Sequence, residues 1–270
     1  MLVEIRDDFD LEKIAQSGQC FRVRKFENGV YRFVSGDDVL YIQGAENHKF
    51  SVSCSIDEWN SIWNPYFDLD RCYNEIFNLE YGKHPFIDEA MVCGRGLRIL
   101  HQNPWEMLIT FITSQRKNIP SISKSVELLA MRYGHPIKTE HESLYSFPSL
   151  YELERVSEEE LIDCRLGYRA QYILDAIHQV ETGNLDLNIL FSYNDAQLIQ
   201  ELQKIHGVGK KVANCIALFA YGRIACVPID IWISRAIEND CEGISPFNLF
   251  KDNAGIIQQY VFYYMKSHQP

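Results

Sequence analysis

Residues 202–222 read LQKIHGVGKKVANCIALFAYG and are the most informative segment in the C-terminal part of the chain. Apolar residues at helical spacing flank a short segment with two glycines, Gly207 and Gly209. Glycine has no Cβ, so the backbone can turn sharply there and approach a neighbour closely. The second helix would begin with free N–H groups that favour a phosphate, beside Lys210 and Lys211. We therefore predict a helix-hairpin-helix that holds a nucleic-acid backbone without reading its sequence. An ordinary turn between two helices is the alternative.

Helical patterns continue on both sides of this hairpin. Residues 103–115 begin with Asn103 as N-cap, Pro104 at the first helical position and Glu106 two residues later, before an apolar run. Gly134 is predicted to end the next helix from beyond its last turn. Further helices are predicted over residues 157–164, 168–183, 195–205, 210–222, 229–240 and 254–267.

The first third of the chain has the pattern of β-strands. Residues 20–26, 30–35, 39–44 and 49–54 are rich in Val, Ile, Phe and Tyr, and turn signals separate them. Turns about ten residues apart favour an antiparallel meander over parallel units. Ser55 is placed to cap a helix that contains Trp59 and Trp63. We predict an α+β protein, with an antiparallel β domain over residues 1–90 packed on an all-helical body over residues 91–270. The last helix of the first part can belong to either.

Composition excludes several classes of protein. With 46% hydrophobic and 23% charged residues, the 270-residue chain is neither disordered, collagen-like nor a coiled-coil rod. It has no apolar run of about 18 residues and no N-terminal targeting pattern. Its eight cysteines form no CxxC pair, so we expect a reduced, cytoplasmic protein. The net charge of −11 falls mostly in residues 1–90, which carry 9 basic and 17 acidic residues, so the rest can still hold a local DNA-binding face.

Two polar residues near the hairpin are candidates for catalysis. Lys211 and Cys215 are four residues apart and share one face of the second helix. Asp230 follows Lys211 by nineteen residues, directly after Pro228 and Ile229, where the next helix is predicted to begin. Taken alone, each has an ordinary interpretation, a surface lysine and an N-capping aspartate. Their combination with the hairpin is more specific.

Together these features resemble the helix-hairpin-helix DNA glycosylase superfamily, whose motif ends in a catalytic Asp. SGQCFR (17–22), LGYRA (166–170), GVGKKVANC (207–215) and AGIIQQYVF (254–262) resemble its 8-oxoguanine glycosylase/AP lyase branch. The endonuclease III and adenine-glycosylase branches of the superfamily usually carry a four-cysteine iron–sulfur loop near the C-terminus. Only Cys241 follows Asp230 here, so no such cluster is expected. The resemblance implies a TBP-like N-terminal domain.

The resemblance also implies roles for individual residues. Lys211 would attack the sugar C1′ and form a Schiff base, which permits strand cleavage by β-elimination. Asp230 would stabilise the positive charge that develops on the sugar. Phe262 would stack on the extruded base, Gln258 would bind its Watson–Crick edge, and Cys215 would form the opposite wall. The Gly18 carbonyl would accept the N7 hydrogen that oxidised guanine has and guanine lacks. For Phe262 alone, core packing is the simpler interpretation, and for Gly18 a turn.

Contacts to the DNA around the lesion are expected from two further segments. Tyr168 and Arg169 match the family's pair that fills the gap and contacts the partner cytosine. In SQRKNIPSI (114–122) the chain departs from the family: Arg116 stands where an Asn is usual, and Ser121 replaces an Arg that reads the cytosine. We therefore expect weaker discrimination of the opposite base, by about 1–3 kcal/mol. Asn118 and the hairpin residues Gly207, Gly209 and Lys210 complete the expected DNA contacts.

The sequence thus predicts a bifunctional enzyme that excises 8-oxoguanine from duplex DNA and nicks the strand. The expected partner is double-stranded DNA containing oxidised guanine, bound by a monomer, with no membrane, no metal and no cofactor. A monofunctional alkylated-base glycosylase would use Asp230 without a Schiff-base lysine. A non-catalytic DNA-binding subunit would need neither residue in register. Trp232, where animal members place a His, has no assigned role.

Overall fold

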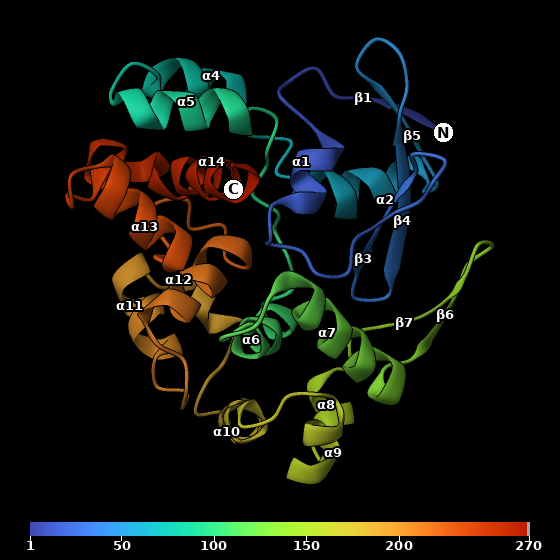
Figure 1. Cartoon of the computed structure of the whole chain (residues 1–270). Coiled ribbons are helices and arrows are strands. Elements are labelled where there is room, and N and C mark those ends of the chain that lie inside the picture. The colour runs from blue at the N-terminus through green and yellow to red at the C-terminus, as the bar shows by residue number, and fades with distance from the viewer. Residues whose placement is uncertain (269–270) are drawn as a thin grey trace. The chain divides into compact units, whose positions relative to one another are not determined.

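The computed structural model describes residues 1–268 (Figure 1). The strands are β1 Leu2–Glu4, β2 Arg24–Lys25, β3 Tyr31–Ser35, β4 Asp38–Gly44, β5 Lys49–Val52, β6 Pro136–Lys138 and β7 Ser143–Tyr145. The α-helices are α1 Leu11–Gln16, α2 Ile56–Glu58, α3 Asn64–Tyr66, α4 Tyr73–Glu80, α5 Pro85–Gly94, α6 Pro104–Thr113, α7 Ile119–Tyr133, α8 Leu150–Leu153, α9 Glu158–Asp163, α10 Arg169–Glu181, α11 Asp195–Leu202, α12 Lys210–Phe219, α13 Ile231–Asp240 and α14 Ala254–Ser267. A π-helical segment, Trp59–Trp63, joins α2 to α3.

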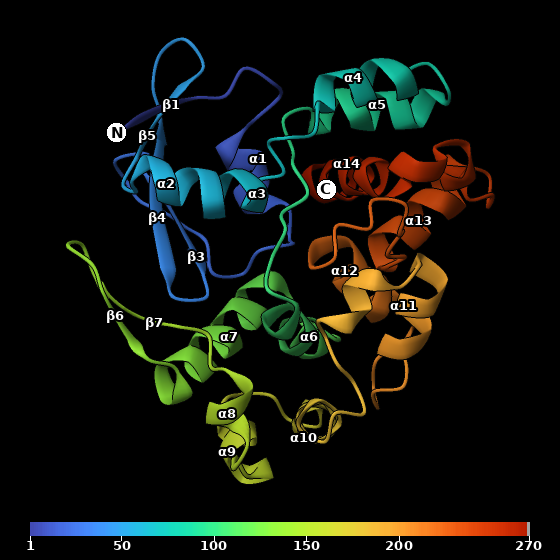
Figure 2. The ribbon, with the colours of Figure 1, turned by 180° about the vertical axis from the view of Figure 1, so that it is seen from behind.

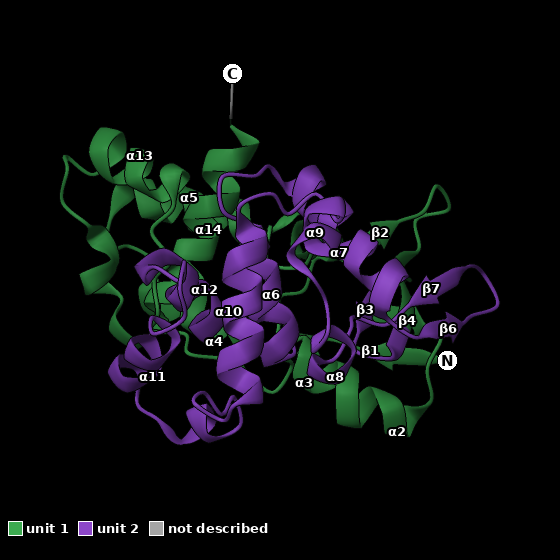
Figure 3. Ribbon diagram, turned by 90° about the horizontal axis from the view of Figure 1, so that it is seen from below, with its two compact units in different colours: residues 1–32, 40–101, 222–270 green, residues 33–39, 102–221 purple. Residues whose placement is uncertain are grey.

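The chain forms two compact units, coloured separately in Figure 3. Unit 1 comprises residues 1–32, 40–101 and 222–270, and unit 2 comprises residues 33–39 and 102–221. The two units are defined by which residues contact one another. The predicted boundary at residue 90 lies instead where the sequence pattern changes from strands to helices. That boundary remains a prediction.

An antiparallel five-stranded sheet forms the N-terminal part, with the strand order β1-β5-β4-β3-β2. Strands β2 to β5 follow one another as the predicted meander, and their turn signals lie where the chain reverses. Strand β1 adds an edge that the sequence did not predict, pairing Val3 with Phe50. The predicted α+β class and the meander are confirmed.

An aromatic cluster lies between this sheet and the helices that follow it. Phe9 makes edge-to-face contacts with Phe50 of β5 and with Phe67, at 5.1 and 5.3 Å between ring centroids. Trp63 and Phe67 have no exposed surface. Ser55 caps α2 as predicted, since its side chain accepts a hydrogen bond from the Glu58 N–H. The cluster buries the largest apolar side chains of this region.

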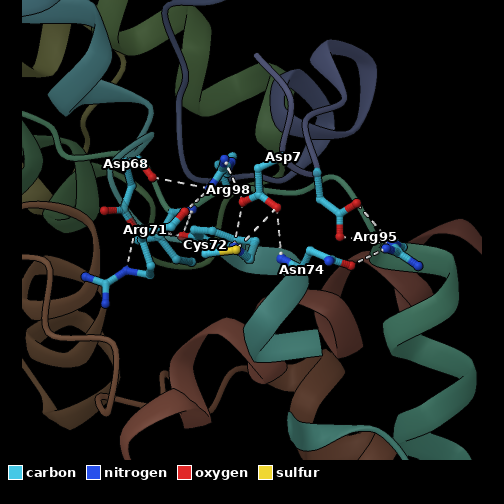
Figure 4. A network of polar contacts seen from close by, with 10 residues as sticks. Asp7, Asp68, Arg71, Cys72, Asn74, Arg95 and Arg98 are labelled. Atoms are coloured by element: carbon cyan, nitrogen blue, oxygen red, sulfur yellow. Dashed lines mark hydrogen bonds and ion pairs between the residues drawn. The ribbon is translucent and has the colours of Figure 1, made fainter. Parts of the chain in front are cut away.

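A network of polar contacts joins the segment after β1 to residues 68–98 within unit 1 (Figure 4). The Asp7 carboxylate accepts hydrogen bonds from the backbone N–H groups of Tyr73 and Asn74, at the start of α4. It also lies 3.1 Å from the fully buried Arg98 guanidinium. Arg98 donates in turn to the Arg71 carbonyl. Because the carboxylate satisfies the free donors of α4, it replaces the capping side chain that this helix lacks.

At the other end of the chain, α14 returns to unit 1 and packs along α5, as both faces of the molecule show (Figures 1 and 2). A Cβ at Gly94 of α5 would lie 2.5 Å from the Tyr260 ring, so this close approach requires glycine. Lys266 near the end of α14 donates to the Gln16 carbonyl at the end of α1. Unit 1 is therefore built from both ends of the chain.

Unit 2 is mainly helical, and its predicted helices are present. Asn103 caps α6 by accepting from the Glu106 N–H, as its capping pattern predicts. The expectation of an all-helical body is wrong in one place, because β6 and β7 form a two-stranded sheet beyond α7. Gly134 ends α7, but its φ of −79° is not left-handed. A Cβ there would lie 2.0 Å from the Ser146 carbonyl oxygen, so glycine is needed for that approach.

Candidate active site

The predicted helix-hairpin-helix is formed by α11 and α12 in unit 2. Asn194 and Gln197 make a capping box at the start of α11. The two glycines of the turn differ. Gly207 has φ +83°, and a Cβ on it would lie 2.3 Å from the Tyr172 ring of α10. Gly209 has φ −81°, and a Cβ on it would meet no atom within 4 Å. Only Gly207 therefore needs to be glycine for the fold.

Three contacts fix the hairpin within unit 2. The His206 N–H donates to the Asp175 carboxylate at 2.7 Å. The His206 ring contacts Tyr172 edge-on at 4.8 Å. The Gln115 side chain donates to the Gly207 carbonyl at 3.1 Å. These contacts hold the hairpin against α10 and against the loop that follows α6.

The start of α12 is open to an anion. Gly209 is its N-cap, and among residues 1–268 no side chain caps this end by a hydrogen bond. Lys210 is exposed beside it. Uncapped N–H groups at the positive end of a helix, with a lysine nearby, suit a phosphate oxygen. The geometry fits the predicted backbone contacts of Gly209 and Lys210.

Lys211 projects from the first turn of α12 and is half-buried. Its Nζ lies 5.5 Å from the centroid of the Phe111 ring of α6, and that ring stacks on Phe219. Cys215, one turn further along α12, is 3% exposed. The Phe111 ring thus provides an aromatic surface beside the Lys211 amine.

Asp230 is the N-cap of α13 in unit 1. Its Oδ1 accepts hydrogen bonds from the N–H groups of Trp232 and Ile233, at 3.0 and 2.9 Å. The capping interpretation of Asp230 therefore holds. Capping is compatible with a catalytic role for Asp230, because the two hydrogen bonds fix the orientation of its carboxylate. Trp232 is half-buried, and the Arg235 guanidinium lies 5.0 Å from its ring centroid.

The predicted base-binding residues Gly18, Gln258 and Phe262 all lie in unit 1. Gly18 directly follows Ser17, the C-cap of α1, and has φ +75°, a conformation that favours glycine. Gln258 is 2% exposed and accepts a hydrogen bond from the Gln259 side chain at 3.1 Å. Phe262 lies one turn further along α14 and is half-exposed. An aromatic ring that is partly accessible can stack on a base.

Buried hydrogen bonds fix the backbone beside Gly18. The fully buried Gln19 donates to the Ser17 hydroxyl and to the Arg98 carbonyl, at 2.9 and 2.7 Å. Its Oε1 accepts from the Leu100 N–H at 2.8 Å. Lys266 binds the Gln16 carbonyl from α14, on the helix that carries Gln258 and Phe262. Burial lowers the pKa of this lysine. Sequence reasoning missed both residues, although Gln19 lies inside the SGQCFR stretch.

The remaining predicted DNA contacts lie on two loops of unit 2. Arg116 is exposed, with φ +51°, and Asn118 is the N-cap of α7, its side chain accepting from the Ser121 N–H. Tyr168 is 49% exposed. Arg169 is only 7% exposed, and its guanidinium donates to the Gln115 and Leu166 carbonyls. The predicted cytosine-contacting arginine therefore has a second function in holding these loops.

The structure thus assigns the predicted residues to two groups. Nine lie in unit 2, namely Arg116, Asn118, Tyr168, Arg169, Gly207, Gly209, Lys210, Lys211 and Cys215, and four lie in unit 1, namely Gly18, Asp230, Gln258 and Phe262. Residues 1–268 contain no group of three His, Cys, Asp or Glu side chains that could hold a metal ion. No helix in that range is long and apolar enough to cross a membrane.

The sequence of this chain is similar to those of known proteins. Residues 1–108 match the family described as 8-oxoguanine DNA glycosylase, N-terminal domain. The N-glycosylase/DNA lyase OGG1 of Arabidopsis thaliana is 37% identical over 232 residues, which are 83% of this chain and 64% of that protein. A yeast (Saccharomyces cerevisiae) N-glycosylase/DNA lyase is 33% identical over 163 residues, 56% of this chain and 43% of its own length. The chain thus spans less than two thirds of these two relatives.

Solved structures extend the likeness over the whole chain. The structure of MBOgg1 in complex with a low affinity DNA ligand is 36% identical and has a TM-score of 0.93, covering 98% of this chain and 95% of that one. This chain belongs to the 8-oxoguanine DNA glycosylase/lyase family. Another member, the Clostridium acetobutylicum 8-oxoguanine glycosylase/lyase bound to double-stranded DNA with cytosine opposite 8-oxoG, is 30% identical. Its TM-score is 0.91, and the match covers 99% of this chain and 98% of that one. The predicted family is confirmed.

Proposed function

We propose that this protein is a bifunctional DNA repair enzyme that excises 8-oxoguanine from duplex DNA and then cleaves the strand at the abasic site. One observation carries the proposal: Lys211 projects from the first turn of α12, beside an uncapped helix end that suits a DNA phosphate. A nucleophile on the helix that binds the backbone would meet the sugar next to that phosphate. The family of the chain supports the same chemistry.

In the proposed reaction the Lys211 amine, in its neutral form, attacks C1′ of the extruded nucleotide. The bond between C1′ and the base breaks, and the base leaves with the electron pair. The amine loses a proton, the C1′–O4′ bond of the sugar ring breaks with a proton passing to O4′, and the open-chain sugar remains attached to Lys211 as a Schiff base. Removal of a proton from C2′ then expels the 3′ phosphate by β-elimination. The Asp230 carboxylate stabilises the positive charge that develops on the sugar. Its two backbone hydrogen bonds keep it oriented without reorganisation during the reaction.

Base selection is assigned to residues of unit 1 and to Cys215. Phe262 stacks on the extruded base, Gln258 binds its polar edge and Cys215 forms the opposite wall. The Gly18 carbonyl accepts the N7 hydrogen of 8-oxoguanine, and guanine would leave this acceptor unpaired. The bonds of Gln19 on either side keep the acceptor in place.

The proposed partner is double-stranded DNA containing oxidised guanine, inside the cell. Gly207, Gly209 and Lys210 hold the backbone, while Arg116, Asn118, Tyr168 and Arg169 face the gap and the opposite base. Ser121 is too short to replace an arginine that donates to cytosine. We therefore expect excision opposite adenine or thymine to be less disfavoured than in members with that arginine. A strong preference for cytosine in cleavage assays would contradict this expectation.

The test uses borohydride, which reduces a Schiff base to a stable covalent adduct. The protein is incubated with a duplex that carries one 8-oxoguanine opposite cytosine, beside the variants Lys211→Gln and Asp230→Asn. Lys210→Gln is the matched control, because it removes a neighbouring exposed lysine from the same helix end. We expect an adduct with the wild type and with Lys210→Gln, the latter at higher protein concentration, and none with Lys211→Gln.

Other outcomes separate the alternatives. Base release without an adduct would indicate a monofunctional glycosylase that depends on Asp230. No release from any damaged base would leave a DNA-binding protein without catalytic activity. An adduct that persists in Lys211→Gln would assign the nucleophile to another amine.

A further inference from the structure

Two loops of unit 2 contain backbone conformations that are costly for the residues that adopt them. Residues 114–118 join α6 to α7, and residues 164–168 join α9 to α10. Arg116 in the first loop has φ +51°, and Arg165 in the second has φ +63°. A residue with a Cβ is strained in the left-handed region, because its Cβ lies too close to the following carbonyl oxygen. Such loops keep one shape only where surrounding contacts hold them.

The contacts that hold these loops run in both directions. Arg169, directly after the second loop, donates through Nε to the Gln115 carbonyl of the first loop at 2.8 Å. Lys117 of the first loop donates to the Arg165 carbonyl of the second at 2.6 Å. The same amine donates to the Ser125 hydroxyl on α7, also at 2.6 Å. Thus Lys117 of the first loop binds the backbone of the second, and Arg169, the first residue of α10, binds the backbone of the first.

The Lys117 amine is partly buried, and two arginine side chains lie near it. Burial, followed by the nearby charges of Arg169 and Arg165, lowers its pKa to about 8. Hydrogen bonds from a charged donor are shorter and stronger than neutral ones, and both bonds here are short. The surroundings of Lys117 therefore disfavour its charged form, while its two hydrogen bonds hold the two loops together.

The outward side of the same loops presents the side chains that would face DNA. Arg116 is exposed, and Tyr168 is 49% exposed. The Arg169 guanidinium lies 4.4 Å from the centroid of the Tyr168 ring and supports it from the protein side. Lys117 itself points inward, to the Arg165 carbonyl and Ser125. A change at Lys117 would therefore move the reading side chains without removing any of them.

We propose that Lys117 is a positioning residue for recognition of the base opposite the lesion, because it fixes the loops that carry Arg116 and Tyr168 relative to each other. This inference rests on the proposed function, since it assumes that the loops meet DNA during excision. It assigns Lys117 no contact with DNA. Its effect on selectivity must therefore pass through Arg116 and Tyr168.

The experiment compares single-turnover excision of 8-oxoguanine opposite cytosine with excision opposite adenine. The variants are Lys117→Met, Arg116→Ala and the double variant, with Lys124→Met as the matched control. Lys124 is an exposed lysine of α7, so its loss changes the local charge equally. We expect the cytosine-to-adenine rate ratio to fall at least threefold in Lys117→Met and to stay within twofold of the wild type in Lys124→Met. The double variant should fall no further than the larger single effect, because coupled residues are not additive.

A second variant guards against a loss of folding. Lys117→Gln retains two N–H donors, so it should recover part of the ratio that Lys117→Met loses. If Lys117→Met is folded by circular dichroism and its ratio is unchanged, the inference is wrong. It is also wrong if the two single effects add in full. Failure of the wild type to release 8-oxoguanine from either duplex would instead contradict the proposed function.

Discussion

The two glycines of the hairpin give the sharpest prediction, because the structure separates their functions. In Gly207→Ala the new Cβ would lie 2.3 Å from the Tyr172 ring at φ +83°. The left-handed conformation costs about 1–2 kcal/mol and the overpacking about 1–3 kcal/mol. The more restricted unfolded chain returns about 0.4–1 kcal/mol. We expect the free energy of unfolding to fall by about 2–4 kcal/mol in total.

Gly209→Ala is the matched comparison, since its Cβ would meet no atom within 4 Å and its φ is −81°. Alanine is a poorer N-cap than glycine by about 0.5–1 kcal/mol, and the unfolded-state term offsets this by about 0.4–1 kcal/mol. Its stability should therefore stay close to that of the wild type. DNA affinity should nevertheless fall, because the added methyl group occupies the space through which a phosphate would approach the α12 N–H groups.

Urea unfolding followed by tryptophan fluorescence measures the first quantity, and titration of a fluorescent duplex at fixed salt measures the second. Equal stabilities for the two variants would refute the packing argument for Gly207. Wild-type affinity in Gly209→Ala would refute the assignment of the phosphate site to this helix end.

Three further predictions concern residues outside the hairpin. Gln19→Leu should lower the free energy of unfolding by about 3–5 kcal/mol. The substitution removes both hydrogen bonds and leaves the buried Leu100 N–H and Arg98 carbonyl without their partner, at about 1–3 kcal/mol each. Chemical denaturation measures this loss, and a value under 1 kcal/mol would contradict the prediction. Asp230→Asn should keep the stability of the wild type because Asn caps equally well, whereas Asp230→Ala should lose about 1 kcal/mol, and both should lose excision; an active Asp230→Asn would reduce Asp230 to a cap. The folded pKa of Lys117 is about 8 against an ordinary 10.5, so the unfolded chain binds more protons between these pH values. The stability of the wild type relative to Lys117→Met should accordingly rise with pH across this window, and equal pH profiles in denaturation would contradict that.

Local sequence patterns predicted those parts of the fold that depend on neighbouring residues. Capping residues such as Asn103 and Ser55, and the glycine turn between α11 and α12, act within a few positions of the helix they begin or end. Strand β1 and the β6–β7 sheet escaped prediction because three-residue strands are too short to show alternation. The helix α1, six residues long, has the same difficulty.

Residues of the candidate site could be predicted where they belong to a sequence motif, and could not where their partners lie in distant segments of the chain. Lys211 and Asp230 stand out because they occur in register with the hairpin motif. Gln19 and Lys117 do not, since their partners lie 79 and 48 residues away and no local pattern marks a lysine that binds a carbonyl. Arg169 was expected to face DNA, and only the fold shows that its guanidinium is also buried against Gln115.

The closure of unit 1 by α14 has a consequence for how the protein is made. Unit 2 is contained in residues 33–221, so its whole sequence is synthesised before α14. Unit 1 must wait, because Tyr260 of α14 lies 166 residues after its neighbour Gly94 of α5, and Lys266 lies 250 residues after the Gln16 carbonyl to which it donates. Contacts so distant in sequence are slow to form, and the apolar face of α5 stays uncovered meanwhile. Nascent unit 1 is therefore the part of this protein that a chaperone would have to protect, and the candidate base-binding residues Gly18, Gln258 and Phe262 are all present only after α14 has been synthesised.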